Sequence, residues 1–313
     1  MYVFNTLVPL LALIALGAAL RRWNFAPPSF FREANRLLYW IAMPALLFYQ
    51  TAEATIQPGA ALRVFLTLLA GMVASIILGY LVALLLRLPR VSVGAFVQGA
   101  YRSNLAYVGL PVVLLSLAAS HAQPMSGGDS LAVLSIAFLI PVYNLTAVVV
   151  LLAGRHVEPG AGRAARQMLR AMVTNPLVLS CTAGLLFVAF GWKLPPVIRQ
   201  TCATLGQMGT PLALLGIGAA LTFASLRYQL VPTSAASLIK VAVGPVIGYL
   251  VARWLGLSSM ELRVALIFLA CPTAAASYVM AQQLGSDDKL AGSIIVVSTI
   301  LSFPVLALSL WVS

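Results

Sequence analysis

Long apolar segments follow one another along almost the entire chain, and polar residues gather in the short connections between them. A transmembrane helix needs roughly 20 consecutive, mostly apolar residues. Of the 313 residues, 61% are hydrophobic and only 8% are charged, whereas soluble domains carry about 25% charged residues. A soluble fold of this length has no interior large enough for so much apolar surface. The sequence therefore predicts an all-α polytopic membrane protein.

The segmentation predicts ten transmembrane helices. Their approximate ranges are 3–20, 34–52, 60–86, 92–120, 130–154, 170–190, 197–223, 230–252, 261–284 and 289–312. A basic connection at 155–169 separates a first group of five spans (1–154) from a second (170–313). Because Arg and Lys accumulate in cytoplasmic loops, their distribution predicts that both termini lie outside. The net charge of +12 then reflects topology rather than nucleic-acid binding.

The two groups of spans carry signs of a duplication. The stretch Gly-Tyr-Leu-Val-Ala at 79–83 recurs at 248–252, and Pro44 of the second span corresponds to Pro211 of the seventh. Because each half has an odd number of spans, the halves have opposite orientations, which makes an inverted repeat. Gly216 and Gly218 in the seventh span predict a close helix contact, either inside a scaffold or at a dimer interface.

Two of the predicted spans are interrupted near their middle. The stretch 99–117 contains Asn104, Gly109 and Pro111, and the stretch 265–284 contains Pro272. Proline removes a backbone donor and clashes with the preceding turn, so these helices are expected to break. Open backbone at membrane depth survives only inside protein or beside a wet cavity. Secondary transporters bind their substrates at such broken helices.

Arg102 and Lys240 are the ionisable residues that fall well inside predicted spans. Placing either charge there costs at least about 2.5–3.5 kcal/mol, unless water, a backbone carbonyl or an anion compensates it. Snorkelling of the side chain to an interface is the alternative. The acidic residues all map to loops or span ends, so cationic side chains without acidic partners favour an anionic substrate.

Four further polar residues are substrate-binding candidates. Asn104 can donate to a carboxylate from the break itself, or it can cap a freed helix end. Asn144 and Tyr278 can contact substrate or pack with a satisfied polar tip. Thr273 lies beside Pro272, and its hydroxyl leaves sodium coupling open because sodium binds to carbonyls and hydroxyls without a carboxylate.

Other function classes find little support in the sequence. The two histidines and three cysteines form no metal-binding pattern, and we predict no metal site and no cofactor. The predicted spans hold no midspan His, Asp or Glu for an intramembrane enzyme. A non-transporting sensor would have only the short 155–169 connection for signalling.

A family resemblance rests on the interrupted fourth span. The stretch Asn-Leu-Ala-Tyr-Val-Gly-Leu-Pro at 104–111 resembles the Asn-x-x-x-x-Gly-x-Pro signature of the auxin efflux carrier family. The stretches that begin at Asn35, Lys240 and Ala270 are similar to that family's second, eighth and ninth spans. The chain lacks the long central hydrophilic loop of the plant PIN branch. It resembles short bacterial members, the branch associated with malate and malonate carriers.

The resemblance carries its own implications. It implies a scaffold of spans 1, 2, 6 and 7, and a transport domain of spans 3–5 and 8–10 that crosses at the two broken helices. It also implies an elevator-like motion, a homodimer in the bacterial inner membrane and a small organic anion as substrate, such as a dicarboxylate or an auxin-like carboxylate. The alternative is a sodium-coupled symporter resembling bile-acid carriers, which share the crossed five-plus-five plan.

Overall fold

The computed structural model describes residues 2–53, 58–119, 127–153, 174, 176–220 and 229–312. Within these ranges every regular element is a helix, apart from one isolated β-bridge, which confirms the all-helical prediction. Four helices are long and apolar enough to cross a membrane, at Gly59–Leu85, Leu131–Ala153, Leu230–Trp254 and Asp288–Val312. They match the predicted spans at 60–86, 130–154, 230–252 and 289–312. The predicted connection at 155–169 lies outside the described residues, and the ten-span inverted repeat stays a prediction.

The chain divides into two compact units. The first takes in residues 1–61, 106–137 and 173–221, and the second takes in residues 62–105, 138–172 and 222–313. The helices of the first unit are α1 (Tyr2–Arg22), α2 (Pro28–Leu37), η1 (Leu38–Ala42), α3 (Met43–Ala52), α6 (Leu110–Ala119), α9 (Pro176–Ala189), α10 (Pro196–Gln207) and α11 (Gly209–Ala220). Those of the second are α5 (Arg90–Tyr101), α12 (Leu230–Leu238), η4 (Ile239–Val243), α13 (Gly244–Trp254), α14 (Ser259–Ala270), α15 (Ala276–Gln283) and α16 (Asp288–Val312). Three helices, α4 (Pro58–Leu85), η2 (Leu105–Gly109) and α7 (Gly127–Ala153), include residues of both units.

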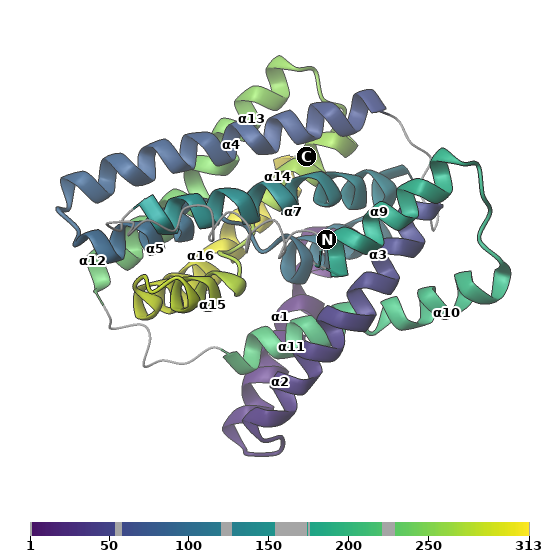
Figure 1. The fold of residues 1–313 in the computed structure, drawn as a ribbon, viewed down its shortest axis with the longest axis horizontal. Helices are drawn as coiled ribbons and strands as arrows, with labels where there is room; N and C mark the ends of the chain where they lie inside the picture. Colours follow the sequence, from purple (N-terminus) through teal and green to yellow (C-terminus); the bar gives the residue numbers. More distant parts are fainter. Residues whose placement is uncertain are drawn as a thin grey trace. The chain divides into compact units, whose positions relative to one another are not determined.

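In the first unit, α1 and α11 pack backbone to backbone, and Figure 1 shows them side by side. A side chain at Gly17 would meet the backbone carbonyl of Leu215, and one at Gly218 would meet the carbonyl of Ile14. Each helix therefore needs a glycine where the other crosses it. The close contact expected for the seventh span lies inside this unit.

In the second unit, α16 packs against α5, α12, α14 and α15. Asp287 precedes α16 and makes two hydrogen bonds with its carboxylate. One oxygen accepts from the Leu290 N–H (3.0 Å), and the other accepts from the Ser92 hydroxyl (2.8 Å). The same side chain thus caps α16 and ties it to the start of α5. The start of α14 is fixed by a capping box between Ser258 and Glu261.

Among the described residues, three five-residue π-helical segments lie just before a proline. The segments are η1, η2 and η4, and the prolines are Pro44, Pro111 and Pro245. Each segment ends two residues before its proline, which then lies in the first turn of the α-helix that follows. A proline inside an α-helix leaves one carbonyl without its usual donor, and π-turns absorb such an irregularity.

We predict that Gly218→Ala destabilises the protein, because its Cβ would collide with backbone that has no freedom to move aside. Overpacking of this kind costs typically 1–3 kcal/mol, and thermal unfolding of the detergent-purified protein measures the loss. Gly79→Ala in α4 is the matched control, since its Cβ would make ordinary contacts at 3.5–3.6 Å. That variant should unfold at or above the wild-type temperature, because alanine is the better helix former. Equal behaviour of the two variants would contradict the proposed α1–α11 contact.

Candidate substrate site

Two extended segments of the second unit pair with each other where α5 and α14 stop. Ser103 and Thr273 form an antiparallel β-bridge. The Asn104 N–H donates to the Pro272 carbonyl (2.8 Å), and the Ala274 N–H donates to the Arg102 carbonyl (2.9 Å). These bonds satisfy buried backbone groups that no helix serves. We refer to residues 102–104 and 271–274 together as the crossing.

The two helices stop for different reasons. Cys271 precedes Pro272 and takes an extended conformation (φ −58°, ψ 148°), as residues before proline prefer. No proline stands next to the end of α5, where Arg102 turns extended (φ −77°, ψ 100°). Pro111 lies further along, as the second residue of α6, and Gly109 is the last residue of η2. The end of α5 therefore depends on its pairing with the other segment.

Two predicted substrate ligands bind backbone carbonyls near the crossing. The Thr273 hydroxyl donates to the Gly99 carbonyl in the last turn of α5 (2.6 Å), and its backbone N–H donates to the Ser298 hydroxyl of α16 (3.0 Å). The Lys240 ammonium, on η4, donates to the Leu269 carbonyl in the last turn of α14 (2.7 Å). Lys240 is only 2% exposed, and a cation is favourable at a helix C-terminus, where carbonyls lack intrahelical donors.

Two side-chain partners of Arg102 are uncharged. Its guanidinium donates to the Asn144 carbonyl oxygen on α7 (2.6 Å) and to the Met280 sulfur on α15 (2.8 Å). The Gln98 amide on α5 also lies near that sulfur, at 3.8 Å. Arg102 is 6% exposed, so these two neutral groups contact its charge at a buried position. The structure thus brings together two residues predicted as ligands, Arg102 and Asn144.

The remaining candidates, Asn104 and Tyr278, differ in their exposure. Asn104 is buried at the crossing, where its backbone makes the bond to Pro272. Tyr278, on α15, is 39% exposed, and its ring lies over Gly292 of α16. Sequence reasoning did not single out Met280 or Gln98, because a methionine and a glutamine inside apolar helices give no distinctive signal.

Several buried polar atoms around the crossing have no hydrogen-bond partner among the described residues. They include the Ser103 and Ser277 hydroxyls, the Gln98 carbonyl oxygen and the Tyr143 hydroxyl. Ser277 lies in the first turn of α15, where a helix presents backbone N–H groups and a partial positive charge. Within the described ranges, no group of three or more His, Cys, Asp or Glu side chains is placed to hold a metal ion.

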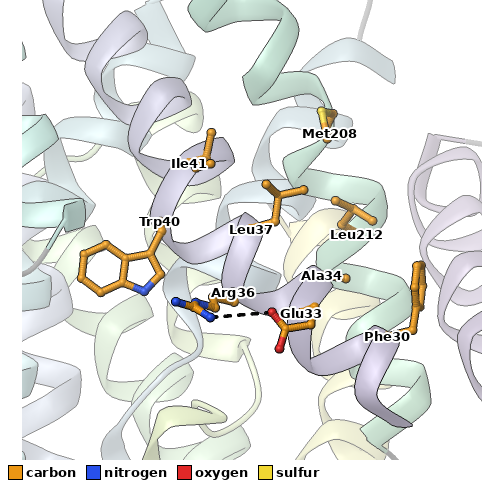
Figure 2. A pocket seen from close by; sticks show the side chains of 9 residues that line it. All are labelled: Phe30, Glu33, Ala34, Arg36, Leu37, Trp40, Ile41, Met208 and Leu212. Atoms are coloured by element: carbon orange, nitrogen blue, oxygen red, sulfur yellow. Dashed lines mark ion pairs between the residues drawn. The ribbon is translucent and has the colours of Figure 1, made fainter. Parts of the chain in front are cut away.

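The first unit contains a separate groove of about 570 Å³ between the α2–η1 region and the α10–α11 region (Figure 2). Its walls are largely apolar, with Trp40, Ile41 and Met208 among them. Glu33 and Arg36 form an exposed ion pair (3.8 Å) at this groove. None of the residues predicted to bind substrate lines it.

We predict that Thr273→Val lowers the melting temperature, because it leaves the buried Gly99 carbonyl without the hydroxyl that serves it. An unsatisfied buried acceptor costs about 1–3 kcal/mol. Thr273→Ser retains the donor and is the matched control, expected to keep most of the stability. Thermal unfolding in detergent compares the three proteins. A Val variant as stable as wild type would show that this hydroxyl does not hold the crossing.

Comparison with known proteins identifies the family. The sequence matches the family described as "Membrane transport protein" over residues 2–311. It is 24% identical over 300 residues to a "Putative malonate transporter" from Rhizobium meliloti, covering 94% of this chain and 91% of that protein. It is 22% identical over 309 residues to "Uncharacterized transporter MJ1031" from Methanocaldococcus jannaschii, covering 96% of each chain. A shorter match, 24% over 145 residues, covers 44% of this chain and 23% of "Auxin efflux carrier component 7" from Arabidopsis thaliana.

These matches confirm the resemblance that the 104–111 motif indicated. The family match also agrees with the four apolar spans of the structure. The chain is therefore a multi-pass membrane protein that belongs to the membrane transport protein family, the family of the auxin efflux carriers.

Proposed function

We propose that the protein is a secondary transporter of a small organic anion and that a substrate carboxylate binds to Arg102. The observation that carries this proposal is the buried guanidinium beside the crossing, which donates to a neutral amide and to a thioether. A thioether sulfur is a weak acceptor. A carboxylate in its place would make charge-assisted hydrogen bonds, which are roughly twice as strong as neutral ones.

The surroundings of Arg102 suit an anion. Met280 belongs to α15, whose first turn carries the hydroxyl of Ser277, which is buried and has no hydrogen-bond partner within the described ranges. A helix N-terminus favours negative charge, and Asn104 supplies a buried side-chain amide at the crossing itself. We therefore assign substrate contact to Arg102, Asn104 and Asn144. We propose that Lys240 and Thr273 act there by holding the crossing, and that Tyr278 contacts the substrate from α15.

The comparisons support this class of substrate. One relative is named for malonate, a dicarboxylate, and another for auxin. The family is a transport family, which also supports the prediction that the chain is not an enzyme. The specific anion differs between such relatives, so we propose the class of small carboxylates rather than one compound.

The finer architecture is part of the same proposal. We propose ten spans in two inverted repeats, with both termini outside the cell membrane. The resemblance to auxin efflux carriers supports a scaffold of spans 1, 2, 6 and 7, a transport domain of spans 3–5 and 8–10, elevator movement and a homodimer. Buried hydroxyls near the crossing, such as that of Ser277, are oxygen ligands that would suit sodium, so sodium dependence belongs in the test.

Asn144→Asp tests the anion site directly. The new carboxylate would replace the amide oxygen that lies 2.6 Å from the Arg102 guanidinium, and would act as a built-in competitor for a substrate carboxylate. We expect a folded, equally or more stable protein whose apparent affinity for malonate falls more than tenfold. Malonate-induced stabilisation in detergent and uptake into proteoliposomes, each with sodium or potassium, are the two measurements.

Asn24→Asp is the matched control. It makes the same change at an exposed turn residue with a positive φ of 52°, a conformation that aspartate tolerates. This variant should behave as wild type in both assays. Full malonate response in Asn144→Asp would refute the role of Arg102, and no response of the wild-type protein to any carboxylate would refute the anion carrier. A response that requires sodium would favour the symporter.

A further inference from the structure

A second groove, of about 450 Å³, lies in the second unit between the η4–α13 segment and the last turns of α16. Its walls include Val241, Pro245 and Tyr249 on the first side and Leu308 and Val312 on the other. The one serine in the wall, Ser309, donates its hydroxyl to the carbonyl of Val305 within its own helix (2.8 Å). Apart from the hydroxyl of Tyr249, the groove therefore presents a largely hydrocarbon surface.

The groove runs along two helices that are long and apolar enough to cross a membrane. Both of its long walls belong to apolar spans, Leu230–Trp254 and Asp288–Val312. Val246, Leu250 and Leu308 line it and are each more than half exposed, at 57–58%. From Val241 to Leu250 a helix rises about 13 Å, so the groove follows the helix axis over a large part of one bilayer leaflet. An acyl chain matches both its chemistry and its direction.

The guanidinium of Arg253 lies where we expect the headgroup of such a lipid. Arg253 is exposed and follows the groove residue Tyr249 by one helical turn, so the two share a face of α13. Arg253 takes part in none of the ion pairs found among the described residues. Trp254 and Trp311 are about four-fifths exposed at the ends of these spans, as residues at a membrane interface are. A guanidinium pairs well with a phosphate.

We propose that this groove binds one acyl chain of an anionic phospholipid whose phosphate pairs with Arg253. The groove lies next to the elements that hold the crossing. Val241 follows Lys240 in η4, and Leu266 lines the groove one turn before Leu269 on α14. The Lys240–Leu269 bond thus joins the two elements that the acyl chain would pack against. A bound lipid therefore stabilises the part of the second unit that holds the crossing.

Thermal unfolding of the full chain tests the proposal in a neutral detergent, without any organic anion. Phosphatidylglycerol and phosphatidylcholine with identical acyl chains are titrated separately. We expect phosphatidylglycerol to raise the melting temperature at lower concentration than phosphatidylcholine. Arg253→Gln should weaken the apparent affinity for phosphatidylglycerol about fivefold, the contribution of one basic residue near a membrane surface. Val246→Trp, which fills the groove from an exposed position, should abolish the response to both lipids.

Lys193→Gln is the matched control, because Lys193 is likewise exposed and adjoins an exposed tryptophan, Trp192, in the first unit. It should keep the wild-type response. Equal responses to the two lipids, or an equal loss in Lys193→Gln, would overturn the role of Arg253. An unchanged response in Val246→Trp would overturn the groove. Native mass spectrometry that finds a second copy of the chain instead of lipid, with Val246→Trp separating the copies, would assign this face to an oligomer and refute the proposal.

Discussion

The pairing of backbone groups at the crossing is the constraint on which the second unit depends. A membrane supplies no water to an open helix end, so each exposed N–H or carbonyl must find a partner in the protein. Asn104 and Ala274 donate across the crossing, while Lys240 and Thr273 reach carbonyls in the last turns of α14 and α5. Because these groups are hydrogen-bonded, two helices can end inside an apolar unit and leave buried polar side chains near the crossing.

The π-helical segments η1, η2 and η4 also provide partners for backbone groups near a proline, and an α-helix follows each of them directly. In a π-turn, an N–H bonds to the carbonyl five residues earlier, as the Met43 N–H does with Leu38 in η1. The residue after a proline can therefore reach the carbonyl that the proline itself cannot serve. Pro44, Pro111 and Pro245 each follow such a segment, and an α-helix continues past each proline. At Pro272 the chain instead becomes extended, and the pairing with residues 102–104 takes over.

The sequence predicts local causes better than distant ones. The apolar runs predict the helical class, and the 104–111 motif indicates the family, because each of these signals lies within a short stretch of neighbouring residues. The end of α14 has a neighbouring cause in Pro272, whereas the end of α5 has none and depends on a segment about 170 positions away. Met280 illustrates the same limit. Only the fold shows that its sulfur meets Arg102, since no pattern around it marks it among other apolar residues.

The two buried cations beside the crossing, Lys240 and Arg102, have different surroundings, and we infer different roles for them. Lys240 is a compact ammonium at the C-terminal end of α14, where the helix dipole and the Leu269 carbonyl offset its charge. Arg102 has a planar guanidinium that donates to an amide oxygen and to a sulfur on two different helices. A bidentate carboxylate fits a guanidinium far better than it fits an ammonium. We therefore propose that Lys240 is a fixed part of the crossing and that Arg102 is the group that responds to a substrate.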